Sequence, residues 1–284
     1  MWAKALRTSA SSAVYTFHML KESYLKRFSG LARIYGADAL PLLQRAKFCI
    51  VGVGGVGSWA AEAAARSGIG QIAPIDHDDI EASNTNRQVH TLTSTLGQSK
   101  VVALRERILQ INPDCDCRAI DDLVTRARLD DFEFQQYDVV IDAIDHAQHK
   151  LSLLHYLRRH KIALVSTGGA GGLTDPTKIE IADMTRTYND PLLAKVRANL
   201  RHQVGYTRNP KRRFGIDCVF STQQPLYPAA GGEVSYEKPD MDQQTTLDCA
   251  TGLGSFVGVT ASFGFAAVAH AIDKYLKQQR KERS

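Results

Sequence analysis

The chain has 284 residues, of which 44% are hydrophobic and 23% are charged, and its formal net charge at pH 7 is +5. These proportions are ordinary for a globular protein, and the length suffices for one large α/β domain or two small ones. The five cysteines include no C-x-x-C pair, which argues against a disulfide framework or a four-cysteine zinc site and favours a reducing compartment.

The N-terminal segment differs from the rest, because its first 21 residues contain no Asp or Glu. We expect residues 1–20 to be a disordered extension and residues 21–284 to form one domain. The segment also resembles an organelle transit peptide faintly, and a start at Met19 is a further reading. We expect a cytoplasmic location, with a mitochondrial one as the alternative if the segment is a transit peptide.

From residue 47 onward, short β-rich runs alternate with helical patterns. This alternation predicts an α/β fold with a Rossmann-like, mainly parallel sheet and helices on both faces. The strands are expected at 47–53, 71–76, 117–122, 137–144 and 162–167. The helices between them are expected at 56–67, 100–110 and 147–160.

After residue 172 the pattern changes to shorter extra strands and one amphipathic helix at about 191–202. The uncharged run 250–272 has nearly the length of a membrane span, but its glycines and small polar residues weaken transfer into lipid. We therefore expect no membrane span there, but a Gly-rich turn followed by a closing buried helix at about 258–276.

The run "GVGGVG" places Gly52, Gly54, Gly55 and Gly57 between the first strand and the first helix. Backbone N–H groups and a helix N-terminus at such a turn face an anion. Asp76 ends the next strand, where a carboxylate hydrogen-bonds a ribose hydroxyl in nucleotide-binding folds. A nucleotide is therefore predicted, and at this point both NAD and ATP remain open.

Residues further along the chain separate these two nucleotides. Asn84 and Arg87 lie in "NTNRQ", and Lys100 follows in "GQSK". A cation pair stabilises charge that develops on phosphates being cleaved, which an NAD site does not require. The run "VVIDAIDH" ends a strand with Asp142 and Asp145, and a carboxylate there suits Mg²⁺ beside phosphates. The order of these residues favours ATP cleavage.

These motifs together resemble the ubiquitin-activating-enzyme-like superfamily of adenylating enzymes, over the chain from about Ser29 to its end. The resemblance implies that a substrate carboxylate attacks ATP to give an acyl-adenylate and pyrophosphate. It implies a homodimer, in which Arg33 of "GLARIYG" reaches the neighbouring subunit's ATP. The position-by-position roles that it implies are ATP binding by Gly52, Gly54, Gly55, Gly57, Asp76, Asn84, Arg87 and Lys100, Mg²⁺ binding by Asp145, and catalysis by Arg87, Lys100 and Asp145.

Three stretches, 167–179, 188–201 and 215–222, resemble the tRNA-modifying branch of this superfamily, which acts on threonylcarbamoyladenosine beside the anticodon. The resemblance implies ATP-dependent dehydration of that nucleoside, with a nucleotide-binding half at about 45–167 and a tRNA-facing half at about 168–284. A segment with no acidic residue then supplies contacts to RNA phosphates. Its basic residues are Lys195, Arg197, Arg201, Arg208, Lys211, Arg212 and Arg213.

Two other functional classes stay open. One is adenylation of the C-terminal glycine of a ubiquitin-like sulfur-carrier protein, although members of that branch commonly carry two zinc-binding C-x-x-C pairs and this chain has none. The other is a non-catalytic nucleotide or dinucleotide sensor. Cys218 lies in a resembling motif and is a candidate reactive thiol or contact for a sulfur-relay partner, against a packing role; the role of Cys249 is open. No zinc is expected.

Overall fold

A computed structural model describes residues 20–238 and 253–283. Most of the predicted N-terminal extension, with Met19, lies outside these residues, as does Cys249. The α-helices and β-strands in chain order are α3 (Glu22–Phe28), α4 (Ala32–Tyr35), α5 (Ala39–Arg45), β1 (Lys47–Val51), α6 (Gly57–Arg66), β2 (Gln71–Asp76), α7 (Lys100–Ile111), β3 (Asp116–Cys117), β4 (Ile120–Asp121), β5 (Val139–Asp142), α8 (Ala147–Arg159), β6 (Leu164–Thr167), β7 (Ile179–Asp183), α9 (Pro191–Val204), β8 (Asp217–Ser221), β9 (Tyr227–Pro228), β10 (Val234–Ser235) and α10 (Val257–Arg283).

The main sheet has the order β3-β2-β1-β5-β6-β8-β7, and β4 also pairs with β2. Neighbouring strands are parallel except β7, which runs antiparallel to β8. The chain leaves β1 toward β2 and leaves β5 toward β6 in opposite directions along the sheet, so β1 and β5 flank a topological switch point. In open α/β sheets, ligands bind outside the carboxyl ends of the strands at this point.

The predicted strand at 117–122 is two short strands, β3 and β4, interrupted at Arg118 and Ala119. Both pair with β2 at the edge of the sheet. Short, interrupted and charged edge strands limit pairing with other chains, and Asp116 and Asp121 are both exposed here. The remaining predicted strands match β1, β2, β5 and β6 closely.

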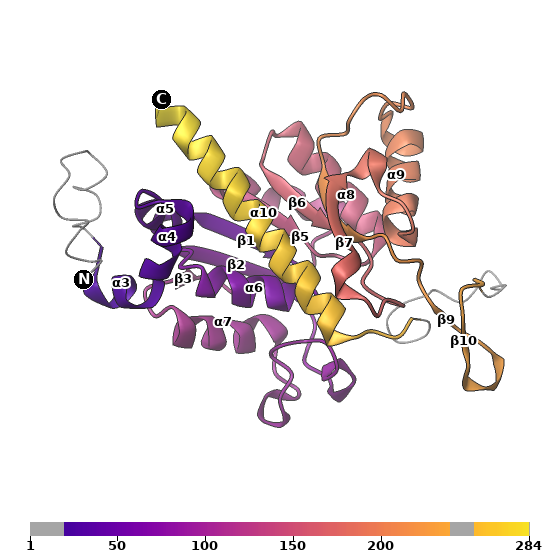
Figure 1. Cartoon of the computed structure of the whole chain (residues 1–284), viewed down its shortest axis with the longest axis horizontal. Coiled ribbons are helices and arrows are strands. Elements are labelled where there is room, and N and C mark those ends of the chain that lie inside the picture. The colour runs from indigo at the N-terminus through magenta and orange to yellow at the C-terminus, as the bar shows by residue number, and fades with distance from the viewer. Residues whose placement is uncertain (1–19, 239–252, 284) are drawn as a thin grey trace.

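Helices cover both faces of the sheet, as predicted. Phe48 and Ile50 of β1 pack with residues of α6, α7 and α10 on one face, whereas Cys49 and Val51 pack with residues of α8 and α9 on the other. This alternation follows from the two-residue period of a strand. In Figure 1, α10 crosses diagonally in front of the sheet and its N-terminal end approaches the carboxyl ends of the strands.

The closing helix is confirmed and extends further than predicted, to Arg283. Its last turns contact the N-terminal helices, since Arg280 pairs with Asp38 through Nε and Oδ2 at 2.8 Å. Among the residues that the structure describes, no helix has the length and apolar character needed to cross a membrane.

The second half of the chain adds α9, the antiparallel pair β7–β8 and the β9–β10 hairpin to the parallel core. Local sequence explains the bounds of α9. Asp190 caps its N-terminus, Pro191 occupies the first helical position, and Gly205 adopts φ 75° after its last turn. These are the residue types that start and stop helices.

Candidate active site

The glycine loop lies at the switch point, where Gly52 follows β1 and Ala143 follows β5. Gly52 has φ +82°, and a Cβ there would lie 3.0 Å from the Ala143 carbonyl oxygen. A Cβ on Gly57 would overlap the Gly52 carbonyl, so both glycines are required by the tight turn itself. Gly54 is different, because a Cβ there would meet only Gln88 Nε2, at 3.8 Å. Its missing side chain leaves room on the cavity side of the loop.

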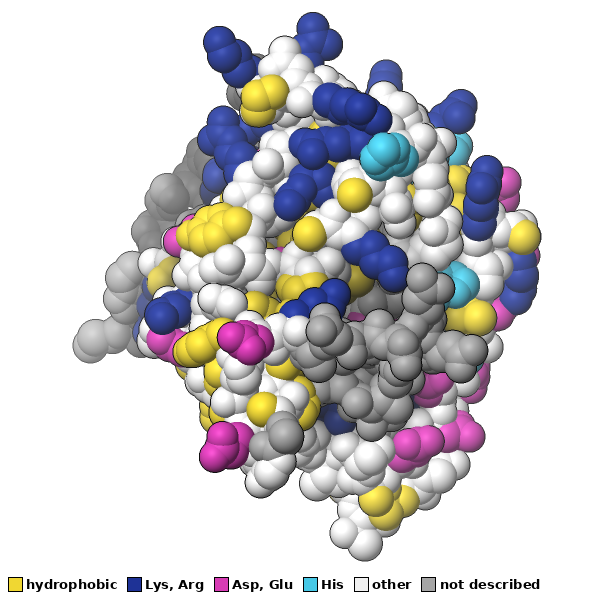
Figure 2. All heavy atoms as spheres, turned by 90° about the vertical axis from the view of Figure 1, so that its right-hand side faces the viewer, with side chains coloured by type: hydrophobic (Ala, Val, Ile, Leu, Met, Phe, Trp, Pro, Cys, Tyr) yellow, Lys and Arg dark blue, Asp and Glu magenta, His cyan; other side chains and the backbone are white. Residues whose placement is uncertain are grey.

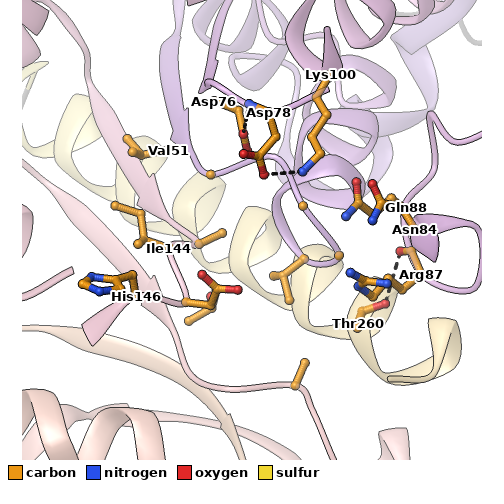
Figure 3. Close-up of a pocket in the computed structure, with 18 of the residues that line it drawn as sticks. Val51, Asp76, Asp78, Asn84, Arg87, Gln88, Lys100, Ile144, His146 and Thr260 are labelled. Atoms are coloured by element: carbon orange, nitrogen blue, oxygen red, sulfur yellow. Dashed lines mark hydrogen bonds and ion pairs between the residues drawn. The ribbon is translucent and has the colours of Figure 1, made fainter. Parts of the chain in front are cut away.

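A cavity of about 850 Å³ opens beside this loop. Figure 3 shows Val51, Ile144 and His146 on one side of it and Asn84, Arg87 and Thr260 on the other. The residues predicted from sequence that line it are Gly52, Gly54, Gly55, Asp76, Asn84, Arg87, Lys100 and Asp145. Gly57 begins α6 behind the loop and Arg33 lies elsewhere, so neither lines the cavity.

The Asp76 carboxylate is fixed at the end of β2 by backbone donors. Its Oδ2 accepts a hydrogen bond from Val53 N at 2.7 Å, and its Oδ1 accepts from His77 N at 2.9 Å and Asp78 N at 3.1 Å. The Val53 bond ties the carboxylate to the glycine loop. Asp76 therefore lies beside the glycine loop, at the strand end where a carboxylate binds ribose hydroxyls in nucleotide-binding folds.

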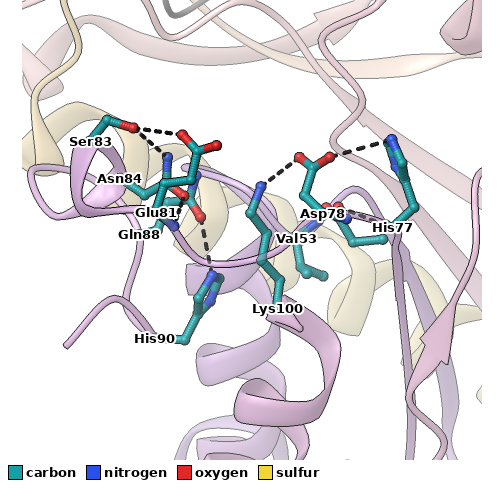
Figure 4. A network of polar contacts seen from close by, with 10 residues as sticks. Val53, His77, Asp78, Glu81, Ser83, Asn84, Gln88, His90 and Lys100 are labelled. Carbon is teal, nitrogen blue, oxygen red and sulfur yellow. Dashed lines mark hydrogen bonds and ion pairs between the residues drawn. The ribbon is translucent and has the colours of Figure 1, made fainter. Parts of the chain in front are cut away.

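Lys100 opens α7 and is almost completely buried, with 5% exposed. Its Nζ donates to Asp78 Oδ2 at 2.6 Å, while Asp78 is half exposed and also lies beside His77. Figures 3 and 4 show this ion pair, and Figure 3 places it among the residues that line the cavity. Asp78 was not predicted as a site residue, although the acidic run "DHDD" is visible in the sequence.

Asn84 and Arg87 occupy a short turn that faces the glycine loop. Asn84 is buried, and its Oδ1 accepts from Glu81 N at 3.1 Å. Arg87 donates from Nη1 to the Ser83 carbonyl at 2.9 Å, and its side chain packs against Gly55. Hydrogen bonds to backbone groups of the turn thus hold both side chains, and the amide and the guanidinium face the cavity (Figure 3).

The closing helix reaches this turn from the other end of the chain. The Arg87 carbonyl accepts hydrogen bonds from Trp59 Nε1 at 2.8 Å and from Thr260 Oγ1 at 3.4 Å. Ser255 and Thr260 line the cavity. Neither residue could be found from a local motif, because both follow the glycine loop by roughly two hundred residues and meet it only through folding.

The wall after β5 holds Asp145 and His146, with His149 in the first turn of α8. Just before them, the fully buried Asp142 accepts from Lys150 Nζ at 2.7 Å and from Ser166 Oγ at 2.7 Å. Asp142 therefore serves as an internal partner for Lys150. Of the two acids predicted at the end of this strand, only Asp145 lines the cavity.

The predicted RNA-binding residues separate into two groups. Lys195, Arg208, Lys211, Arg212 and Arg213 are exposed. In Figure 2, Lys and Arg side chains gather on the upper part of the face that carries α9, and acidic side chains lie lower.

Arg197 and Arg201 differ from the other five residues, because both are partly buried. Arg197 Nη1 donates to the carbonyls of Met184 at 3.0 Å and Thr187 at 2.9 Å, and burial lowers the pKa of its guanidinium. Arg201 lies over the Phe214 ring, 5.6 Å from the centroid. These internal contacts of Arg197 distinguish it from the exposed residues of the basic stretch.

For Cys218 both a reactive thiol and a packing role were open, and its surroundings favour packing. It lies fully buried in β8, and burial raises the pKa of its thiol well above the ordinary range. A reactive cysteine needs an accessible thiolate. The structure therefore supports packing for Cys218, and not a reactive thiol or a sulfur relay.

A Rossmann-like sheet with a glycine loop, a strand-end carboxylate and two converging cations at its switch point defines a nucleotide-binding α/β protein. The chain belongs to the ThiF family, whose model matches residues 26–283. This confirms the membership predicted from the sequence, and with it the fold class.

Comparison with individual proteins assigns the similarity to one branch of the family. The chain is 46% identical to the tRNA threonylcarbamoyladenosine dehydratase of Escherichia coli over 93% of this chain and 98% of that protein. It matches the solved structure of TcdA (CsdL) with a TM-score of 0.84 and 46% identity, covering 92% of this chain and 98% of that one. The Escherichia coli dehydratase in complex with ATP matches with a TM-score of 0.81 and 43% identity, over 93% and 99% of the two chains. The predicted resemblance to the tRNA-modifying branch is confirmed.

Proposed function

We propose that this protein catalyses the ATP-dependent dehydration of threonylcarbamoyladenosine in tRNA to its cyclic form. The observation that carries the proposal is the similarity to tRNA threonylcarbamoyladenosine dehydratase along nearly the whole chain, combined with a cavity that suits ATP. The glycine loop offers space for phosphates at Gly54, and Lys100 and Arg87 supply positive charge beside it.

The reaction has two displacements. The threonyl carboxylate of the nucleoside attacks the α-phosphorus of ATP, and pyrophosphate leaves. The carbamoyl group of the same side chain then attacks the activated carbonyl carbon, AMP leaves, and a five-membered ring closes. The nucleoside has lost one water, and ATP has become AMP and pyrophosphate. Because the second nucleophile is intramolecular, proximity supplies much of the rate, and no enzyme thiol is needed.

The residues of the cavity take separate roles in this proposal. Asp76 holds the ribose, Asn84 binds the triphosphate, and Arg87 and Lys100 neutralise charge on the leaving pyrophosphate. Lys100 is already paired with Asp78, which keeps the ammonium directed into the cavity before ATP binds.

Asp145, Asp76 and Asp78 line the cavity, and carboxylate oxygens are the ligands that Mg²⁺, a hard cation, prefers. Asp145 is the residue we propose to hold it. When bound, Mg²⁺ supplies charge neutralisation for the phosphates.

The tRNA is proposed to contact the exposed residues of the basic stretch, Lys195, Arg208, Lys211, Arg212 and Arg213. We keep the division into a nucleotide-binding half at 45–167 and a tRNA-facing half at 168–284 as part of this proposal, although Gly168, Gly169, Ser255 and Thr260 of the second half also line the cavity. A cytoplasmic location, where tRNA is available, accompanies this proposal.

A homodimer is also proposed. Arg33 is exposed on α4, away from the residues that line the cavity of its own chain. A role for Arg33 at ATP therefore requires a second subunit. Mixing an Arg33→Ala subunit with a Lys100→Ala subunit tests this, because a mixed dimer with trans contacts retains one complete site, whereas neither variant alone is active.

The direct test is incubation of the protein with ATP, Mg²⁺ and tRNA carrying threonylcarbamoyladenosine, followed by mass spectrometry of the nucleosides. We expect that nucleoside to lose one water, with AMP formed in equal amount. An unchanged nucleoside would refute the assignment. The alternative, adenylation of a carrier protein's C-terminal glycine, predicts ATP–pyrophosphate exchange that a carrier protein stimulates and tRNA does not.

A further inference from the structure

One buried carboxylate joins the basic helix α9 to the wall of the cavity. Asp190 Oδ1 accepts a hydrogen bond from Leu193 N at 2.9 Å, which caps α9, and Oδ2 accepts one from Gly169 N at 3.0 Å. Gly168 and Gly169 follow β6 and line the cavity. A single side chain, only 6% exposed, therefore fixes the first turn of α9 against the loop that bounds the nucleotide site.

The loop is shaped for this contact. A Cβ on Gly168 would overlap Asp190 Oδ2, whereas a Cβ on Gly169 would lie 3.7 Å from Leu192 Cβ and 3.9 Å from Asp190 Oδ1. Glycine at 168 is therefore required by the approach of the carboxylate. In the sequence, Gly168 belongs to the stretch 167–179, which resembles the tRNA-modifying branch. The structure shows why a glycine is needed at this position.

The cavity loop after β5 is attached to the same buried cluster of charges. Asp142 Oδ1 accepts from Ile144 N at 3.1 Å, and its Oδ2 accepts from Lys150 Nζ. Burial raises the pKa of the Asp190 carboxyl, while the amides of Leu193 and Gly169 and the charge of Lys150 oppose this rise. Lys150 thus acts electrostatically on the carboxylates that hold both loops.

The outer side of α9 belongs to the basic surface. Lys195 lies one turn beyond the cap and is exposed. It is close enough to the cavity to contribute, after burial and His149, to a lowered pKa of His146, which lines the cavity. A polyanion on Lys195 and a nucleotide beside Gly169 would therefore both act on elements that meet at Asp190.

Building on the proposed function, we propose that Asp190 is a positioning residue that couples tRNA binding on α9 to ATP binding in the cavity. Each ligand orders one side of the shared contact, so the second ligand binds to a site that is already partly ordered. Thermodynamic linkage makes such coupling reciprocal: tRNA tightens ATP binding by the same factor by which ATP tightens tRNA binding.

The test measures that factor in the full-length protein. The affinity for α,β-methylene ATP, which cannot be cleaved at the α-phosphate, is determined with and without saturating tRNA carrying threonylcarbamoyladenosine. Asp190→Asn retains the oxygen that caps α9 but presents an amide N–H to Gly169 N. Asp190→Ser retains an N-cap hydroxyl that is too short to reach Gly169, and it serves if Asp190→Asn does not fold. Asp175→Asn is the matched control, because Asp175 also precedes a proline and caps a short helix, but its side chain contacts Thr177, which does not line the cavity.

We expect tRNA to tighten nucleotide binding about fivefold or more in the wild type and in Asp175→Asn, the lower end of ordinary couplings between sites. In the Asp190 variants the factor should fall to between one and two, while tRNA binding alone changes less. A wild-type factor of one, or a factor that the Asp190 variants retain, would overturn the inference. A failure of the proposed function is distinguishable from a failure of this inference. In that case the wild-type protein with hydrolysable ATP would leave the nucleoside unchanged.

Discussion

Lys100 Nζ lies 2.6 Å from Asp78 Oδ2, so the buried cation at the start of α7 is held at the cavity by an acid that is itself half exposed. This ion pair holds Lys100 in place but uses only one of the three N–H donors of its ammonium group. Two of them remain for phosphate oxygens. The geometry is that of a preorganised cation, which stabilises charge in a reaction better than a side chain that must first be ordered.

Lys100→Ala should lower the rate of ATP-dependent AMP formation by about 100-fold or more, the effect of losing one preorganised charge donor. Arg87→Ala should have a similar effect, since its guanidinium faces the same cavity. AMP release with modified tRNA measures both, and circular dichroism checks the fold. Lys277→Ala, an exposed position on α10, is the control. Activity that survives both cavity substitutions would show that neither cation is needed for turnover, whereas a wild type that releases no AMP would favour a non-catalytic nucleotide sensor.

The glycine loop supplies a matched pair of variants. Gly54→Ala should leave the stability nearly unchanged and weaken ATP binding, because its methyl group would enter space on the cavity side. Gly57→Ala should lower the free energy of unfolding by about 1–3 kcal/mol, since the methyl group meets the Gly52 carbonyl in a closely packed turn. Thermal unfolding and ATP titration separate the two effects. Equal loss of stability in both variants would show that Gly54 is also required by the turn.

The sequence anticipated most of the cavity because the motif residues follow strand ends, and strand ends of a parallel sheet converge. Asp76, Arg87 and Lys100 needed only the order of the strands to be brought together. Thr260 could not be predicted in this way, because its place at the Arg87 carbonyl depends on how α10 packs across α6.

The basic stretch shows a second limit. Lys195 and Arg197 have similar chemistry in the sequence, but residues two apart lie on different faces of a helix. Lys195 is exposed, whereas Arg197 turns toward the Met184 and Thr187 carbonyls. Net charge therefore identified a basic region of the sequence, and not which of its cations face outward.

Cys218→Ala should retain dehydration activity and lose about 1 kcal/mol of stability, a typical result for a small buried substitution. In the native wild-type protein, Cys218 should not react with iodoacetamide at pH 8, because burial raises the pKa of its thiol and hides it from reagent. Peptide mass spectrometry after brief labelling measures this, with labelling in denaturant as the positive control. Rapid native labelling of Cys218, or loss of activity in a folded Cys218→Ala protein, would restore the reactive-thiol hypothesis.

Changing Lys211, Arg212 and Arg213 together to Ala should weaken tRNA binding and reduce the slope of log affinity against log salt by about 2–3, if each contacts one phosphate. Arg197→Ala should instead lower stability, since its donors serve the Met184 and Thr187 carbonyls. Binding is measured by filter retention from low to high salt. Three basic residues at the end of α10, Lys277, Lys281 and Arg283, form the control set. A slope unchanged by the first set would make that loop an ordinary solvated surface.

His90 predicts a pH dependence of stability. It is 2% exposed, its Nε2 lies 3.1 Å from Gln88 Oε1 (Figure 4), and Gln88 lines the cavity. Burial, with Lys100 and Arg107, lowers the pKa of His90 to about 4 from an ordinary 6.5. Between these two pH values the unfolded chain binds a proton at this histidine and the folded protein does not. The contribution of the neutral His90 to the free energy of unfolding is therefore complete above pH 6.5 and is lost as the pH falls toward 4. The loss is at most about 3 kcal/mol.

His90→Gln keeps an amide donor near Gln88 and cannot take up the proton. In urea unfolding at a series of pH values, the variant should lose less stability than the wild type between pH 6.5 and 4, and the two curves should run parallel above pH 7. The exposed His160→Gln is the control and should follow the wild type throughout. ATP affinity should fall with the wild-type stability in the same pH range, because His90 supports Gln88. Parallel curves for His90→Gln and the wild type down to pH 4 would mean that His90 takes up its proton equally in the folded and unfolded states.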